Sequence, residues 1–150
     1  MDRQQILILA LLGTAAFVGA FSPMGHADEI GAFIGSKHVG TRYPYNEKNL
    51  GGYGKLSLTK HTGLVAGAYV NSLSKVSILA GAYAEVDNTW TGVGITGGLL
   101  TGYRTPVPFG AAPYVYALVG QARATVTALP VIEDHELTGV ALGLSIGYTY

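Results

Sequence analysis

The chain has 150 residues, with nine basic side chains, nine acidic side chains and no cysteine. A formal net charge of zero without a basic stripe offers nucleic acid no electrostatic footprint, and the absence of thiols excludes disulfides, cysteine-bound metals and cysteine nucleophiles. Charged residues make up only 12% of the chain and 22 residues are glycine, a composition poorer in charge than that of an ordinary soluble domain.

The first 27 residues have the pattern of a secretory signal peptide. Arg3 precedes an apolar run over residues 6–21, and Gly25-His26-Ala27 forms a small-x-Ala cleavage site. The alternative is a membrane anchor, but the run is shorter than the roughly 20 residues that a spanning helix needs. We therefore expect residues 1–27 to be removed on export and residues 28–150 to form one mature domain.

Turn-forming residues divide the mature chain into eight segments in which side chains alternate in size. Most segments are close to the 9–11 residues that a tilted transmembrane strand requires. The predicted strands cover residues 30–40, 51–59, 64–72, 76–85, 91–103, 110–119, 124–131 and 138–150. They predict an all-β fold, an eight-stranded antiparallel transmembrane β-barrel, which we expect to be a monomer in the outer membrane of a Gram-negative bacterium.

The last predicted strand carries the clearest pattern. Its large residues share one face, and its small residues share the other, because strand side chains alternate with a period of two. The large face comprises Leu144, Ile146, Tyr148 and Tyr150, and the small face comprises Gly143, Ser145, Gly147 and Thr149. This is typical of the closing strand of an outer-membrane barrel, with the large face toward lipid.

Strand parity predicts which loops share a side of the membrane. An even-stranded barrel keeps both termini in the periplasm, so odd strands run outward. The loops expected on the external side are 41–50, 73–75, 104–109 and 132–137.

The lumen is predicted to be narrow, because eight strands enclose a space that side chains just fill. Gly92, Gly94 and Gly98 share one strand face, and the only charges well inside strands are Lys55 and Glu85. Two interpretations remain open: an apolar lumen that holds one acyl chain, or glycines that only ease curvature and close packing. Under either interpretation the lumen is too narrow for a porin. Seven tyrosines, mostly near strand ends, are assigned to interfacial aromatic girdles: Tyr43, Tyr45, Tyr103, Tyr114, Tyr116, Tyr148 and Tyr150.

Three prolines predict a weak seam between neighbouring strands. Pro108 and Pro113 lie at the start of the sixth predicted strand, and Pro130 lies at the end of the seventh. Proline donates no ladder hydrogen bond, so the two strands are expected to part at the external end. Such a gap would lie level with the outer leaflet and would admit lipid. Pro108 alone is equally explained as a turn residue.

Parity also brings three polar residues to the external rim. His38 ends the first predicted strand, and Asn71 and Ser72 end the third. A hydroxyl, an imidazole and an orienting amide are parts of an activated acyl-transfer site. Asn-Ser is also ordinary turn chemistry, and a rim histidine can simply be solvated. His61 and His135 fall at opposite ends of the barrel, so we expect neither a metal site nor a cofactor.

Several segments, in this order, resemble the outer-membrane lipid A palmitoyltransferase family, and the resemblance covers nearly all of the mature barrel. They are His38, residues 42–54 with Tyr45-Asn46-Glu47 and Gly51-Gly52, residues 63–75 with Asn71-Ser72, Gly81-Ala82-Tyr83, Gly92-Val93-Gly94, and the prolines at 108, 113 and 130. The family moves a palmitoyl chain from a phospholipid to lipid A, binds the acyl chain inside the barrel, and admits lipid between proline-weakened strands.

The resemblance implies His38 as the acid/base group and Ser72 as the essential hydroxyl, with phospholipid and lipopolysaccharide as partners. Asn71 stands where the family has Asp, the family's N-terminal amphipathic helix is missing after residue 27, and loop 41–50 is short. The competing hypothesis is therefore a non-catalytic small barrel that binds lipid or modifies surface recognition, a phage-encoded one included.

Overall fold

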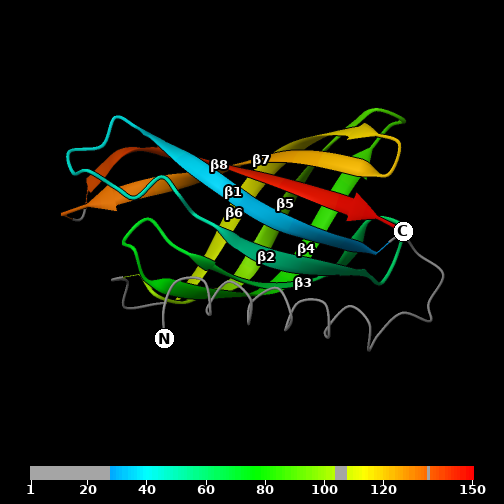
Figure 1. Cartoon of the computed structure of the whole chain (residues 1–150), viewed down its shortest axis with the longest axis horizontal. Coiled ribbons are helices and arrows are strands. Elements are labelled where there is room, and N and C mark those ends of the chain that lie inside the picture. Colours follow the sequence, from blue (N-terminus) through cyan, green and yellow to red (C-terminus); the bar gives the residue numbers. More distant parts are fainter. Residues whose placement is uncertain (1–27, 104–107, 135) are drawn as a thin grey trace.

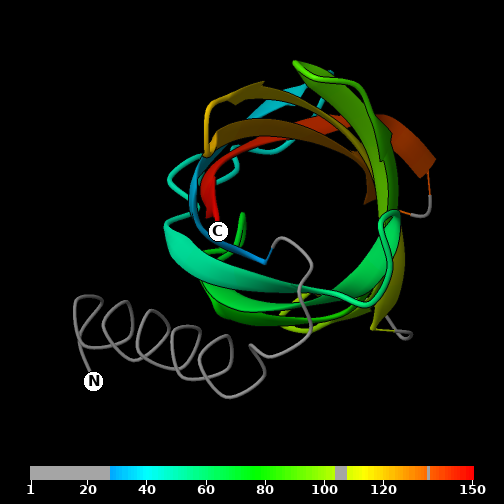
Figure 2. The ribbon, with the colours of Figure 1, turned by 90° about the vertical axis from the view of Figure 1, so that its right-hand side faces the viewer.

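The computed structural model describes residues 28–103, 108–134 and 136–150, so the predicted signal peptide lies outside the described residues. The chain forms a closed antiparallel barrel in which each strand pairs with the next and β8 pairs with β1 (Figures 1 and 2). The strands are β1 (Glu29–Val39), β2 (Gly51–Ser57), β3 (Thr62–Val70), β4 (Val76–Asp87), β5 (Thr91–Leu100), β6 (Phe109–Val119), β7 (Ala122–Glu133) and β8 (Glu136–Thr149). The predicted all-β eight-stranded barrel is confirmed.

Side chains alternate between a lipid-type exterior and a packed interior. Large aliphatic residues point outward and are exposed, among them Ile78, Val93, Ile95, Val115, Leu144 and Ile146. Tyr53, Val65 and Tyr83 are buried inside, with Phe33 and Leu79 packed against them. A closed barrel with aliphatic residues outside is a fold of the outer-membrane type. No helix in the described ranges is long and apolar enough to cross a membrane.

The last hairpin differs from the prediction. Residues 132–137 are expected to form an external loop, because four acidic or polar residues follow one another there. In the structure the ladder continues through Ile132↔Leu137 and Glu133↔Glu136. Asp134 takes a positive φ of 50°, which a tight hairpin turn requires. Pairing along the two long strands therefore extends the hairpin beyond the point where local polarity suggests a loop.

A bulge in β1 decides which way its outer end faces. The β1–β8 register shifts between Phe33 and Gly35, which leaves Ile34 as an extra residue. One extra residue moves every later side chain to the opposite face. His38 then pairs with buried Ala141, so it lies on the inner face although it is out of step with Phe33.

Two seams of the barrel are only partly paired. β1 and β2 pair from Glu29↔Lys55 only as far as Phe33↔Gly51. β6 and β7 pair from Val119↔Ala122 only as far as Tyr114↔Thr127. Both seams are unpaired toward the end that carries loop 40–50, opposite the chain termini.

Candidate functional site

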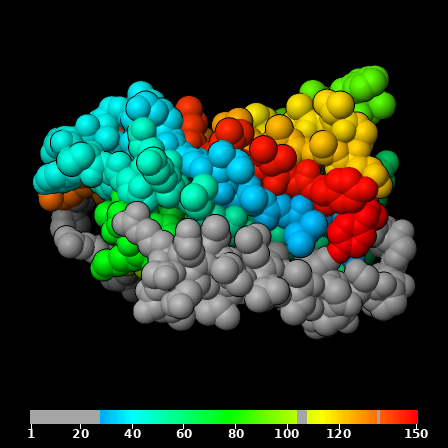
Figure 3. Space-filling view, in the orientation of Figure 1, coloured from blue at the N-terminus to red at the C-terminus, as the bar shows by residue number. Residues whose placement is uncertain are grey.

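His38 is held at the rim by loop 40–50, which connects β1 to β2. Its ring stacks on Tyr45, with 4.7 Å between centroids and 20° between planes. Its Nδ1 atom is buried and has no hydrogen-bond partner among the described residues. The loop (cyan) forms one end of the molecule, away from the C-terminus (red), as Figure 3 shows. The stacked ring therefore has a fixed plane at the mouth of the barrel.

Glu47 ties the same loop to β1. Its backbone oxygen accepts a hydrogen bond from Ser36 N at 2.9 Å, and its carboxylate accepts from His38 N at 3.3 Å and Lys37 Nζ at 3.2 Å. The hydrogen bond from Lys37, with help from the His38 amide, lowers the pKa of Glu47. The open part of the β1–β2 seam is thus occupied by this loop.

Tyr45 is fixed in turn by the β7–β8 hairpin. Its hydroxyl donates to Glu133 Oε1 at 2.9 Å, and Glu133 also accepts from the backbone amides of Arg42 and Tyr43. Burial, followed by the bond to Glu133, raises the pKa of Tyr45 to about 12. Tyr45 is therefore neutral and acts as a hydrogen-bond donor at ordinary pH.

Asn71 has a different environment from the one expected. Its side chain is fully buried and makes four hydrogen bonds. Nδ2 donates to Ser77 Oγ at 2.9 Å and Gly102 O at 3.0 Å, while Oδ1 accepts from the amides of Leu73 and Lys75. An amide has no hydrogen-bonding position left beyond these to orient a histidine. In the structure Asn71 anchors the β3–β4 turn and does not contact His38.

Ser72 lies beside the same loop as His38. Its carbonyl accepts a hydrogen bond from Asn46 N at 2.9 Å, and Asn46 neighbours both Tyr45 and Glu47. The Ser72 hydroxyl makes no hydrogen bond within the described part of the chain. The structure thus brings His38 and Ser72 to loop residues 45–47. The carbonyl of Asn71 also accepts from Asn46 Nδ2 at 3.1 Å, but the Asn71 side chain is held in the β3–β4 turn. A catalytic role for His38, Asn71 and Ser72 stays a prediction.

The barrel interior is charged at the end that carries the termini, so an apolar lumen does not extend to this end. Lys55 Nζ lies 3.6 Å from Glu29 and 2.8 Å from Glu85, and Arg123 lies 3.2 Å and 2.8 Å from the same two carboxylates. Buried charges persist only when they are paired in this way. Arg123, expected at a turn, and Glu29, expected before the first strand, both point inside.

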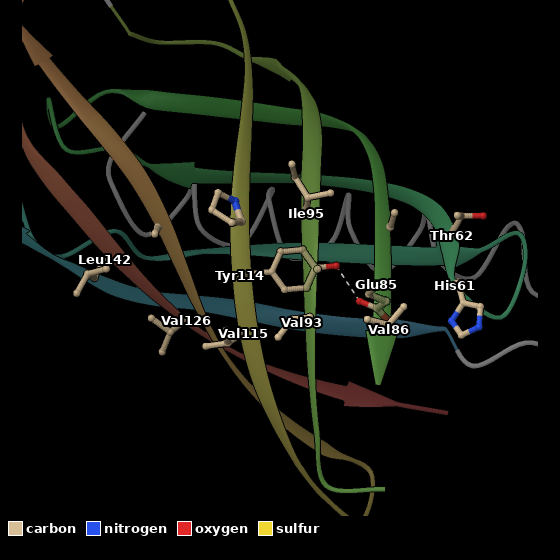
Figure 4. Close-up of a pocket in the computed structure, with 14 residues that line it drawn as sticks. His61, Thr62, Glu85, Val86, Val93, Ile95, Tyr114, Val115, Val126 and Leu142 are labelled. Carbon is tan, nitrogen blue, oxygen red and sulfur yellow. Dashed lines mark hydrogen bonds between the residues drawn. The ribbon is translucent and has the colours of Figure 1, made fainter. Parts of the chain in front are cut away.

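Tyrosine rings complete this network. Arg123 lies 3.5 Å above the ring of Tyr116, and Lys55 lies 3.9 Å above that of Tyr83. Tyr114 donates its hydroxyl to Glu85 at 2.8 Å, the dashed line in Figure 4. The assignment of Tyr114 and Tyr116 to an aromatic girdle is wrong, since both are buried inside the barrel.

The three lumen glycines give space to their neighbours. A Cβ at Gly92 would overlap the Tyr116 ring, one at Gly94 the Tyr114 ring, and one at Gly98 the backbone of Ala80 and Gly81. One cavity inside the barrel, lined among others by Phe33, Tyr53 and Arg123, measures about 70 Å³, against roughly 300–1,000 Å³ for a ligand pocket. An acyl chain at Gly92 or Gly94 would have to displace a tyrosine, so the lumen assignment stays a prediction with this cost attached.

The prolines sit at the open β6–β7 seam. Pairing stops at Tyr114↔Thr127, Pro113 is the next residue on β6, and Pro130 lies three residues further along β7. Pro108 precedes β6, and its carbonyl accepts from Leu100 N. Lipid access at these prolines stays a prediction. What the structure has there is a stretch of β6 and β7 in which the two strands do not pair with each other.

An apolar hollow of about 650 Å³ opens on the outer face next to this seam. Aliphatic side chains of β4 to β8 surround it, including Val86, Val93, Val115, Val126 and Leu142 (Figure 4). Pro113 and Ala128, the first residues beyond the last β6–β7 pair, also line it. The hollow therefore reaches the open seam. The described residues include no group of three or more His, Asp or Glu that could hold a metal ion.

The fold and its apolar exterior define an eight-stranded barrel of the outer-membrane type. No protein-family model matches the sequence, and no curated protein matches it. Among solved structures, the chain is similar to the N-terminal β-barrel domain of Pseudomonas aeruginosa OprF, at 15% identity and a TM-score of 0.42, over 83% of this chain and 97% of that domain.

Proposed function

We propose that this protein is an outer-membrane acyltransferase of the lipid A palmitoyltransferase type, which moves a fatty acyl chain from a phospholipid to lipid A. The observation that carries the proposal is the β6–β7 seam, unpaired beyond Tyr114↔Thr127 and bordered by an apolar hollow. Open backbone at membrane depth must be buried in protein or otherwise satisfied by polar groups. A phospholipid entering from the outer leaflet would place its acyl chain in the apolar hollow and its ester oxygens near the open amides of the seam.

In this proposal, His38 and Ser72 at the rim carry out the transfer. His38 takes the proton of a lipid A hydroxyl as that oxygen attacks the phospholipid ester carbonyl. The new ester forms, the old ester bond breaks, and the proton passes from His38 to the leaving lysophospholipid oxygen. Ser72 contributes a hydroxyl that has no other hydrogen-bond partner in the described part of the chain. Loop residues 45–47 contact both residues, which supports a shared site.

A second candidate function is a non-catalytic barrel that binds lipid at the same seam or alters surface recognition. Two observations favour it. Asn71 is committed to the β3–β4 turn by four hydrogen bonds, and the inner cavity of about 70 Å³ is too small for an acyl chain. The loop-side surface would then carry the function, and His38 would serve only to pack the loop.

Mass spectrometry of lipid A separates the two candidates. Cells expressing the chain are compared with cells carrying an empty vector and with cells expressing Ser72→Ala. The proposal expects a mass gain of one acyl chain that is lost with Ser72→Ala, since that hydroxyl has no structural partner.

The matched control is Ser74→Gly, which removes a hydroxyl from the same turn. Glycine accepts the φ of 58° at this position without strain, so transfer should persist. Each variant is checked for folded barrel in the outer-membrane fraction. A folded, correctly located protein that leaves lipid A unchanged would exclude this acyl transfer and favour the second candidate.

A further inference from the structure

His38 needs partners that hold its ring and its charge, and the β3–β4 turn does not supply them. Asn71 donates both Nδ2 protons to Ser77 and Gly102 and accepts two amides on Oδ1. Rotating this amide toward His38 would leave a buried carbonyl and two turn amides without partners. Whatever orients His38 must come from another element.

Loop 40–50 supplies two such groups. Tyr45 covers one face of the imidazole at 4.7 Å, and its own hydroxyl is fixed by Glu133. Glu47 lies across the open β1–β2 seam with its carboxylate on the His38 amide and on Lys37. Tyr45 therefore sets the plane of the ring, and Glu47 places a carboxylate on the backbone amide of the same residue.

We propose that Tyr45 and Glu47 are the positioning residues of His38, Tyr45 through its stacked ring and Glu47 through its bond to the His38 amide and its negative charge. Its catalytic consequence rests on the proposed function, while the contact itself does not. The charged groups around His38 are Glu47 from the loop and Lys37 from β1, and the facing β8 residues Val140, Ala141 and Leu142 are uncharged.

This arrangement predicts the direction in which the pKa of His38 changes when either charged neighbour is removed. A nearby carboxylate favours imidazolium and a nearby ammonium disfavours it. Glu47 is partly exposed, so the effect is that of a solvent-screened surface pair. Glu47→Gln should lower the pKa of His38, and Lys37→Gln should raise it. In an active enzyme the acid limb of the pH–rate profile would move by the same amount and in the same direction.

The test is an NMR titration of the His38 ring protons in the purified, detergent-folded full barrel. Wild type is compared with Glu47→Gln, Lys37→Gln and the control Glu136→Gln, which removes a carboxylate paired instead with Arg42. Opposite shifts for the first two variants and none for the control are expected. Glutamine keeps the Glu47 side-chain length and its backbone bond to Ser36, so the loop should stay in place.

A second variant separates ring stacking from charge. Tyr45→Phe keeps the stacked ring and loses the bond to Glu133, whereas Tyr45→Leu loses both. A His38 ring-proton shift that moves strongly only in Tyr45→Leu supports the stack, because an aromatic ring shifts nearby protons. An unchanged His38 pKa in both charge variants would overturn the role of Glu47. The NMR titration does not require enzymatic activity. A lipid A experiment without acylation would therefore count against the proposed function, but it would not decide whether Tyr45 and Glu47 position His38.

Discussion

At the scale of single residues, the sequence and the structure give different roles to the side chain of Asn71. The sequence resemblance implies that it stands in the place of a catalytic carboxylate, but in the structure both of its amide protons are donated inside a buried turn. A carboxylate has no protons to donate, and it would face the carbonyl oxygen of Gly102. The amide is therefore the residue that this turn requires.

We predict that Asn71→Asp, which introduces the carboxylate of the resembled family, destabilises the barrel by about 1–3 kcal/mol, because two buried acceptors lose their donors. Unfolding by guanidinium in detergent, followed by the folded-barrel band, gives the difference. Asn88→Asp is the control, since Asn88 only accepts hydrogen bonds through Oδ1 and Asp retains that ability. Equal stability of the two variants would show that Asn71 does not anchor the turn.

At the scale of elements, the two partly paired seams differ in what covers them. Loop 40–50 covers the β1–β2 seam through Glu47 and through Asn49, which accepts from the Ser36 hydroxyl of β1 and donates to Val70 O of β3 at 3.1 Å. At the β6–β7 seam, the residues beyond Tyr114↔Thr127 face an apolar hollow instead. Proline accounts for part of this difference, because Pro113 and Pro130 lack the amide protons that a ladder uses.

A disulfide across the β6–β7 seam tests its use as a lipid route. The chain has no cysteine, so Ala112→Cys with Leu129→Cys introduces the only two thiols. If lipid enters here, oxidation should abolish lipid A acylation and a reductant should restore it. The control pair, Val115→Cys with Val126→Cys, bridges residues that are already paired, and oxidation there should leave activity intact. Full activity of the oxidised Ala112 and Leu129 variant would exclude this route.

At the scale of the whole molecule, the charged network joins four strands across the lumen. Glu29 comes from β1, Lys55 from β2, Glu85 from β4 and Arg123 from β7. These contacts fix the terminal half of the barrel and fill it, while both seams stay unpaired in the other half. The molecule thus has a closed end near the termini and a less paired end near the loops.

Arg123→Ala should lower the free energy of unfolding by about 3–5 kcal/mol, because it leaves the Glu29 and Glu85 carboxylates buried with one cation between them. The measurement is again the guanidinium midpoint of the purified barrel. Arg42→Ala serves as the comparison, because its pair with Glu136 is exposed and contributes about 0–1 kcal/mol. Similar midpoints for the two variants would contradict a stabilising network.

The sequence by itself determined the strands, the barrel and the rim on which His38 and Ser72 lie, because period-two alternation and turn residues are local properties. It placed Pro113 and Pro130 at the ends of neighbouring strands, whereas the structure has them within β6 and β7. Only the tertiary structure decided what fills the barrel. Glu29, Lys55, Glu85 and Arg123 are far apart in sequence, and they meet because closure brings their strands' inner faces together.

The tertiary structure also decided the surroundings of His38. The extra residue at Ile34 turns His38 inward, and no local pattern announces a bulge, since it depends on the register against β8. The partners of His38 come from a loop whose conformation is set by contacts with β1 and the β7–β8 hairpin. The candidate residues can therefore be predicted from the local sequence. Which of them lie next to one another depends on the pairing of distant strands.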